Sequence, residues 1–121
     1  MQFLLMIYRS ETELAKMSSA DLSAMYGEYG KFTEEIQNSG NYIGGNPLKP
    51  TSTATTVRVR DSKRVVTDGP FAETKEQLGG YYLIEASDLD QAISIAARIP
   101  GARHGSIEVR PIMARTQAVQ A

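Results

Sequence analysis

The chain has 121 residues, 13 basic and 14 acidic side chains, a formal net charge of −1 and no cysteine. This length predicts one domain with its own hydrophobic core. Without cysteine, disulfides, Cys-based zinc sites and thiol catalysis are excluded, and a cytoplasmic location is expected. The balanced, scattered charge argues against nucleic-acid binding. The apolar run Phe3–Ile7 is too short to span a membrane.

Hydrophobic periodicity and turn residues predict the elements in chain order. Residues 2–8 form a strand that is apolar on both faces. There follow a helix from Ser18 or Ser19 to about residue 39, a short strand at 42–44, two strands at 53–60 and 63–67 joined by a tight turn at Asp61-Ser62, one or two helical turns at 72–77, a strand at 79–86, a helix from Ser87 or Asp88 to 99, and a strand at 106–112. Residues 1–113 are expected to form the domain, and 114–121 a flexible tail.

This order is β-α-β-β-α-β, with one extra short element before the second hairpin and another inside it. It predicts an α+β, ferredoxin-like antiparallel sheet with both helices on one face. Strands 2–8 and 79–86 are apolar on their other face too, and monomers rarely expose such a patch. We therefore expect a homodimer, sheet against sheet, in a dimeric α+β barrel. The alternative is that a loop or the tail covers this face.

The most specific stretch of the chain is Val66–Gly80, which reads V-T-D-G-P-F-A-E-T-K-E-Q-L-G-G. Gly and Pro at fixed offsets each restrict the backbone, so such a turn is hard to exchange between folds. With Ala54–Arg58, Ala96–Pro100 and Val109–Pro111 in the same order, the sequence resembles the DGPF group of YCII-related proteins from about residue 1 to 113.

The resemblance implies a dimeric α+β barrel and a link to extracytoplasmic-function sigma factors or stress contexts, but no settled reaction. Relatives in the wider superfamily are thought to use a His–Asp pair whose His lies on the first helix. This chain departs from that pattern, since Ser19–Ser39 contains no His and the only one is His104.

Three residues are the candidates for polar chemistry. Asp68 is either a general acid/base or a turn residue whose carboxylate accepts backbone N–H bonds. Arg58 is either a clamp for a carboxylate or phosphate group or the partner of Asp68 or Glu85 in a structural ion pair. His104 is either a proton shuttle or an exposed loop residue.

Four further residues are candidate ligand contacts. Phe71 and Tyr82 either line an apolar pocket or pack in the core or dimer interface. Lys75 and Glu76 either face the site or form weak ion pairs in solvent. No metal-ligand spacing, Walker loop or dinucleotide fingerprint is present, and no cofactor is expected.

Three functions are compatible with these patterns. The favoured one is a homodimeric small-molecule-binding or regulatory domain. The second is a small-molecule enzyme that uses Asp68, with His104 nearby, in a cleft beside the dimer interface. The third is a module that docks a protein partner through a strand edge or the tail. Whether the protein is an enzyme is left open at this point.

Overall fold

The computed structural model describes residues 1–115, and strand β1 (Gln2–Arg9) lies at its centre. β1 pairs antiparallel with β5 (Gln77–Glu85) on one side and with β6 (Ser106–Pro111) on the other. β2 (Tyr42–Pro47) pairs with the outer edge of β5. The resulting order, β2-β5-β1-β6, is that of the split βαβ arrangement. The α+β class with an antiparallel sheet, predicted from the sequence, is confirmed.

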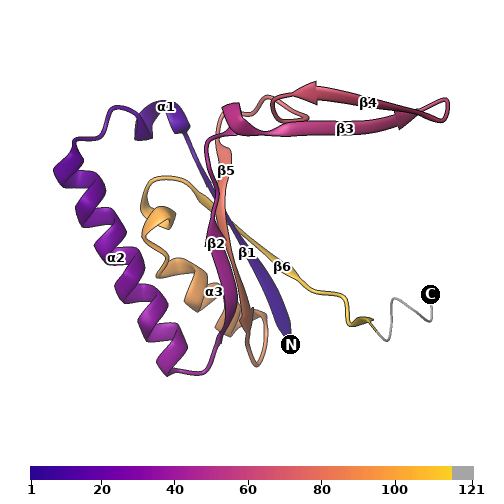
Figure 1. Ribbon diagram of the computed structural model, residues 1–121. Helices are drawn as coiled ribbons and strands as arrows, with labels where there is room; N and C mark the ends of the chain where they lie inside the picture. The colour runs from indigo at the N-terminus through magenta and orange to yellow at the C-terminus, as the bar shows by residue number, and fades with distance from the viewer. Residues whose placement is uncertain (116–121) are drawn as a thin grey trace.

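Two helices, α2 (Ser19–Asn38) and α3 (Leu89–Ala97), pack on the same face of this sheet (Figure 1). The Ser18 hydroxyl caps α2 by accepting a hydrogen bond from the backbone N–H of Asp21. The Asp88 carboxylate caps α3 through the N–H of Gln91. Both helix starts agree with the sequence prediction. Three short elements connect the larger ones: α1 (Glu11–Leu14), η1 (Thr51–Thr53) and η2 (Pro100–Arg103).

The core lies between the helices and the inward-facing residues of the central strands. Alternate residues of β1 and β5 point into it, as the two-residue period of a strand requires. The largest fully buried side chains are Phe3, Leu5, Ile36, Ile84 and Ile99. The opposite face of the sheet carries Leu4, Met6, Tyr81 and Leu83, all partly exposed.

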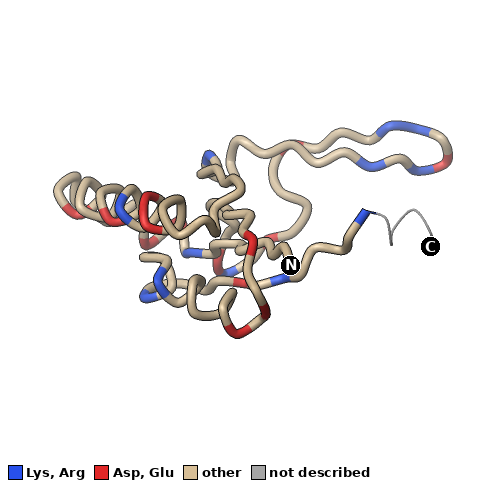
Figure 2. The backbone as a smooth tube through the Cα atoms, turned by 90° about the horizontal axis from the view of Figure 1, so that it is seen from below, with Lys and Arg blue, Asp and Glu red and all other residues tan. Residues whose placement is uncertain are grey.

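Strands β3 (Thr55–Arg60) and β4 (Lys63–Asp68) form a separate two-stranded sheet that projects from the body of the molecule (Figure 1). Its tip is the predicted turn, where Asp61 and Ser62 have φ of 51° and 62°. Positive φ at both positions matches the twist of a two-residue hairpin. Basic residues lie toward the tip (Figure 2), and valines of both strands are exposed.

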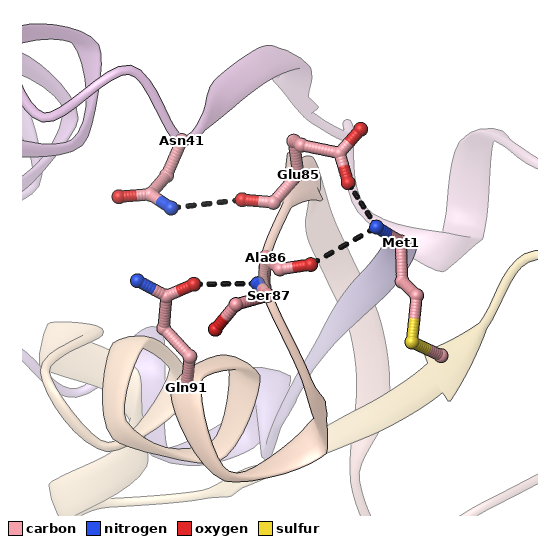
Figure 3. A network of polar contacts seen from close by, with 6 residues as sticks. All are labelled: Met1, Asn41, Glu85, Ala86, Ser87 and Gln91. Carbon is pink, nitrogen blue, oxygen red and sulfur yellow. Dashed lines mark hydrogen bonds and ion pairs between the residues drawn. The ribbon is translucent and has the colours of Figure 1, made fainter.

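A group of polar contacts joins the chain start to the end of β5 (Figure 3). The amine of Met1 contacts the Glu85 carboxylate and donates to the carbonyl of Ala86 at 3.0 Å. The Asn41 side-chain amide donates to the carbonyl of Glu85 at 2.8 Å. These contacts hold the loop between α2 and β2 against the β1–β5 pair, at the end of β5 remote from Gln77.

The prediction of helical turns at 72–77 is wrong, because this segment has no helix and β5 already begins at Gln77. The Thr74 hydroxyl donates to the carbonyl of Glu76, and the Gln77 side-chain amide donates to the carbonyl of Thr74. Such local bonds compete with helical ones and favour an irregular segment. The strand expected at 42–44 extends to Pro47.

The predicted C-terminal tail, residues 114–121, lies outside the described residues from 116 onward. Within residues 1–115, no helix combines the length and the apolar character that crossing a bilayer requires.

Candidate functional site

A cavity of about 700 Å³ lies between the N-terminal half of α2 and the end of the sheet where β5 begins. Its walls come from α1, α2, the end of β1, and strands β2 and β5. The lining is mainly apolar with a few polar side chains. Ligand sites in proteins have volumes of about 300–1,000 Å³ and this kind of lining. The cavity therefore has the size and character of a small-molecule site.

Glycines on the sheet create the floor of this cavity. Gly80 is paired with Ile7 and Gly45 with Tyr82, so both glycines lie at helix-facing positions of the sheet. A Cβ added at Gly45 would approach the Tyr81 carbonyl oxygen to 2.7 Å and Cδ1 of Tyr82 to 2.9 Å. Only Gly at this position lets the Tyr82 ring lie against β2.

A β-bulge interrupts the β1–β5 ladder beside the cavity. Ile7 pairs with Gly80 and the next residue, Tyr8, pairs with Leu78, so Gly79 has no partner in β1. Bulges increase local twist and redirect the side chains that follow. Gly79 also lines the cavity, so the irregular part of the ladder coincides with the site.

The apolar stripe of α2 divides between the core and the cavity. Phe32 and Ile36, in its C-terminal half, are buried in the core. Leu22, Met25 and Tyr29, toward the N-terminus, are only partly buried and line the cavity instead. Figure 1 shows this end of α2 diverging from the sheet. The N-terminal part of this stripe thus supplies the roof of the cavity.

A short hydrogen-bond chain fixes the orientation of Tyr82. The Thr33 hydroxyl donates to the carbonyl of Tyr29 at 2.8 Å, and it lies 2.7 Å from the Tyr82 hydroxyl. Because Thr33 has a single O–H, the Tyr82 hydroxyl is the donor in the second contact. The Tyr82 ring packs edge-to-face against Phe32 and Tyr42, with centroid distances of 5.2 and 6.3 Å.

Tyr29, on α2, lines the same cavity as Tyr82, which comes from β5. Its hydroxyl oxygen accepts a hydrogen bond from the backbone N–H of Gly101 at 3.1 Å, so its own proton remains available to another acceptor. Burial raises the pKa of the Tyr29 phenol, and burial likewise raises the pKa of Tyr82. Both phenols are therefore neutral O–H donors at physiological pH.

Arg9, the last residue of β1, brings a positive charge to the cavity wall. Its Nη1 and Nη2 atoms donate only to thioether sulfurs, those of Met25 at 3.1 Å and Met17 at 3.5 Å. Its Nε is buried and has no hydrogen-bond partner, and Arg9 forms no ion pair with any residue in 1–115. Sulfur is a weak acceptor, so the guanidinium is poorly satisfied by the protein.

Glu11, the acidic residue in the lining, is engaged elsewhere. Its two carboxylate oxygens accept hydrogen bonds from the backbone N–H of Thr51 at 2.8 Å and from the Thr51 hydroxyl at 2.6 Å. The backbone N–H of Glu11 donates to the Gln77 side chain at 2.9 Å. These bonds hold α1, which lines the cavity, against η1 and the start of β5.

Of the predicted site residues, Tyr82 lines this cavity. Arg58 and Asp68 are exposed on the projecting hairpin, and Phe71, in the segment after it, is 80% exposed. Neither Arg58 nor Asp68 makes an ion pair within residues 1–115, so the alternative in which Arg58 pairs with Asp68 or Glu85 is not formed.

The other three predicted residues also lie outside the cavity lining. Lys75 is exposed in the irregular segment before β5. Glu76 accepts a hydrogen bond from the Ser106 hydroxyl at 2.8 Å, which ties this segment to β6. His104 is exposed at the end of η2. Within residues 1–115 no group of three or more His, Cys, Asp or Glu side chains could hold a metal ion.

Sequence reasoning did not select Arg9, Tyr29 or Thr33. Arg9 follows an apolar strand and had no feature to separate it from a solvated linker residue. One signal was present: α2 carries more apolar and aromatic residues toward its N-terminus than a two-layer core needs.

A family model for the YCII-related domain matches residues 1–116, nearly the whole chain. The chain belongs to the YCII-related family. The Asp68–Phe71 turn that carried the resemblance lies at the end of β4, where Gly69 has φ of 96° and its N–H donates to the carbonyl of Ala54 at 2.7 Å. This positive φ explains the glycine in that turn.

Two individual proteins can be compared with this YCII-related chain. An uncharacterized protein of Rhizobium meliloti (strain 1021) is 49% identical over 67 residues, and this match spans 54% of each sequence. The structure of 5-chloro-2-hydroxyhydroquinone dehydrochlorinase from Burkholderia phenoliruptrix AC1100, in complex with 2,5-dihydroxybenzoquinone, superposes with a TM-score of 0.56. It is 15% identical and covers 97% of this chain and 98% of its own, so it shows a shared fold.

Proposed function

We propose that this YCII-related protein is a small-molecule-binding domain whose site is the cavity between α2 and the sheet. The observation that carries the proposal is the cavity itself: about 700 Å³, roofed by one helix and floored by glycines of two strands. Its polar groups are few and held in place, since Tyr82 is oriented by Thr33 and by its aromatic neighbours. A preformed apolar cavity with a few oriented polar groups is typical of ligand sites.

The proposal includes a homodimer formed through the face of the sheet opposite the helices. Leu4, Met6, Tyr81 and Leu83 form a contiguous apolar surface there, because they occupy paired positions on β1 and β5. A two-fold interface requires one self-complementary patch, and a mainly apolar sheet face meets this requirement. The link to sigma-factor or stress contexts is supported by the resemblance of the DGPF turn.

The alternative function is a small-molecule enzyme with Asp68 as acid/base. The observation that favours it is the fold shared with a dehydrochlorinase whose structure holds a quinone. Against it, Asp68 is exposed on the hairpin and does not line the cavity. Binding in the cavity without catalysis by Asp68 is therefore the better-supported proposal.

Filling the cavity should abolish binding. The neutral fluorophore N-phenyl-1-naphthylamine is a suitable probe, because its emission rises in an apolar site. Leu22→Trp places a larger ring in the cavity, whereas Ala24→Trp adds the same ring on the exposed side of α2. We expect Leu22→Trp to weaken probe binding by at least about tenfold, equivalent to about 1.4 kcal/mol. Ala24→Trp and Asp68→Asn should bind as the unaltered protein does.

Equal binding by the Leu22 and Ala24 variants would show that the probe occupies another surface and would overturn the proposed site. A loss of binding with Asp68→Asn, with the fold retained by circular dichroism, would favour the enzyme alternative instead.

A further inference from the structure

The cavity contains a positive charge that no acidic side chain balances. The Arg9 guanidinium contacts two thioether sulfurs, and its Nε is buried without a partner. Arg9 as a whole is partly buried, and a charge withdrawn in part from water is normally accompanied by a carboxylate or several strong acceptors, because its desolvation is costly. Here two guanidinium nitrogens contact only sulfur and the third has no partner, so the donors of Arg9 are poorly satisfied by the described residues.

The acidic side chain of the cavity lining, Glu11, and Glu28 on α2 are both engaged elsewhere. Both oxygens of Glu11 are bonded to Thr51. Glu28, next to Tyr29 on α2, forms an ion pair with Arg103. Neither carboxylate pairs with Arg9, so its guanidinium remains available to an anion supplied from outside residues 1–115.

The surroundings of Arg9 suit one kind of ligand. Tyr29 is close enough to Arg9 for the positive charge to favour ionisation of its phenol, although burial outweighs this effect. The Tyr29 hydroxyl also has its proton free for an acceptor, as described above. A guanidinium and a phenol O–H beside an aromatic, apolar chamber match an anionic oxygen group attached to a ring.

We infer that the cavity selects ligands with an anionic head group, such as a carboxylate, sulfonate or phenolate, on an aromatic or other apolar body, with Arg9 binding the anion and Tyr29 and Tyr82 flanking the body. This inference rests on the proposed function, because it assigns a ligand class to the same cavity. It adds a role for Arg9 that neither the family assignment nor the fold neighbour supplies.

A matched pair of probes tests the inference. 8-Anilino-1-naphthalenesulfonate carries a sulfonate, and N-phenyl-1-naphthylamine has the same aromatic body without it. In the unaltered protein the sulfonate probe should bind more tightly. Arg9→Met keeps an unbranched side chain beside the methionines and removes the charge, and we expect it to weaken the sulfonate probe by about tenfold or more. The neutral probe should change by less than about twofold.

Three controls complete the experiment. Arg64→Met removes a charge from the exposed hairpin and should leave both affinities unchanged, which separates local binding from net charge. Arg9→Lys should retain part of the preference for the sulfonate. Should Arg9→Met lower stability, Arg9→Gln should still show the same loss of preference.

The inference is overturned if the preference for the sulfonate survives in Arg9→Met and Arg9→Gln, or if the unaltered protein does not prefer the sulfonate. In either case, neutral-probe binding that remains sensitive to Leu22→Trp leaves the proposed function intact. If neither probe responds to Leu22→Trp, the cavity does not bind ligands and both proposals fail.

Discussion

The contact between Glu11 and Thr51 should make a measurable contribution to stability. Glu11→Ala removes two charge-assisted hydrogen bonds, to the backbone N–H and the hydroxyl of Thr51. Hydrogen bonds to charged groups contribute about 1.5–3 kcal/mol each when shielded. This contact is only partly buried, and water can replace the lost acceptor, so we expect a total loss of about 2 kcal/mol. For a domain of this size that corresponds to a melting temperature lower by roughly 6–10 °C.

Glu13→Ala is the matched control. Glu13 lies in the same first turn of α1, so it shares the helix propensity and the interaction with the helix dipole. Its carboxylate makes no hydrogen bond or ion pair with residues 1–115, and it is exposed. Its loss should change the free energy of unfolding by less than about 0.5 kcal/mol.

Urea unfolding followed by circular dichroism measures both variants. Thr51→Val, which removes only the hydroxyl, should fall between them at about 1 kcal/mol. A Glu11→Ala variant no less stable than Glu13→Ala would refute the view that this contact holds α1 in place.

Two further predictions concern assembly and alkaline pH. Light scattering should give twice the subunit mass for the unaltered protein and the mass of a single subunit for Leu83→Lys, which places a charge on the open face of β5. A single-subunit mass for the unaltered, folded protein would contradict the homodimer. The pKa values of Tyr29 and Tyr82 are raised above the value of 10.0 for the unfolded chain, so the stability linked to their neutral forms is fully present at pH values below 10. That contribution is lost as pH rises above 10 through the folded values. The free energy of unfolding, measured in urea between pH 8 and pH 11, should therefore fall less in a Tyr29→Phe/Tyr82→Phe variant, and equal losses would count against burial as the cause.

Much of the architecture could be predicted because it depends on local chemistry. Ser18 and Asp88 cap helices through their own side chains, and the apolar run of residues 2–8 identified the first strand, which the structure has as Gln2–Arg9. The helical turns expected at 72–77 failed for a related reason: Thr74 and Gln77 bond to nearby backbone groups and stop a helix from forming.

The site was harder to predict because it depends on what is missing from the sheet. Gly45 and Gly80 line the cavity at helix-facing positions of the sheet, and this can be recognised only when the register of β2 and β5 is known. The sequence analysis placed the site around the charged Asp68–Phe71 turn, because this combination of residues is specific. Gly69 in this turn is explained by its positive φ. Of the predicted site residues, only Tyr82 lines the cavity.

The projecting hairpin of β3 and β4 should unfold locally more easily than the rest of the molecule. β3 and β4 bond only to each other as a sheet, and Val57, Val59 and Val66 are each more than half exposed. An isolated two-stranded ribbon has little stability of its own in water. The amide protons of the hairpin should exchange with solvent through local unfolding, whereas those of β1 should exchange only through the much rarer global unfolding. We therefore expect the hairpin to unfold and re-form while the four-stranded sheet stays intact.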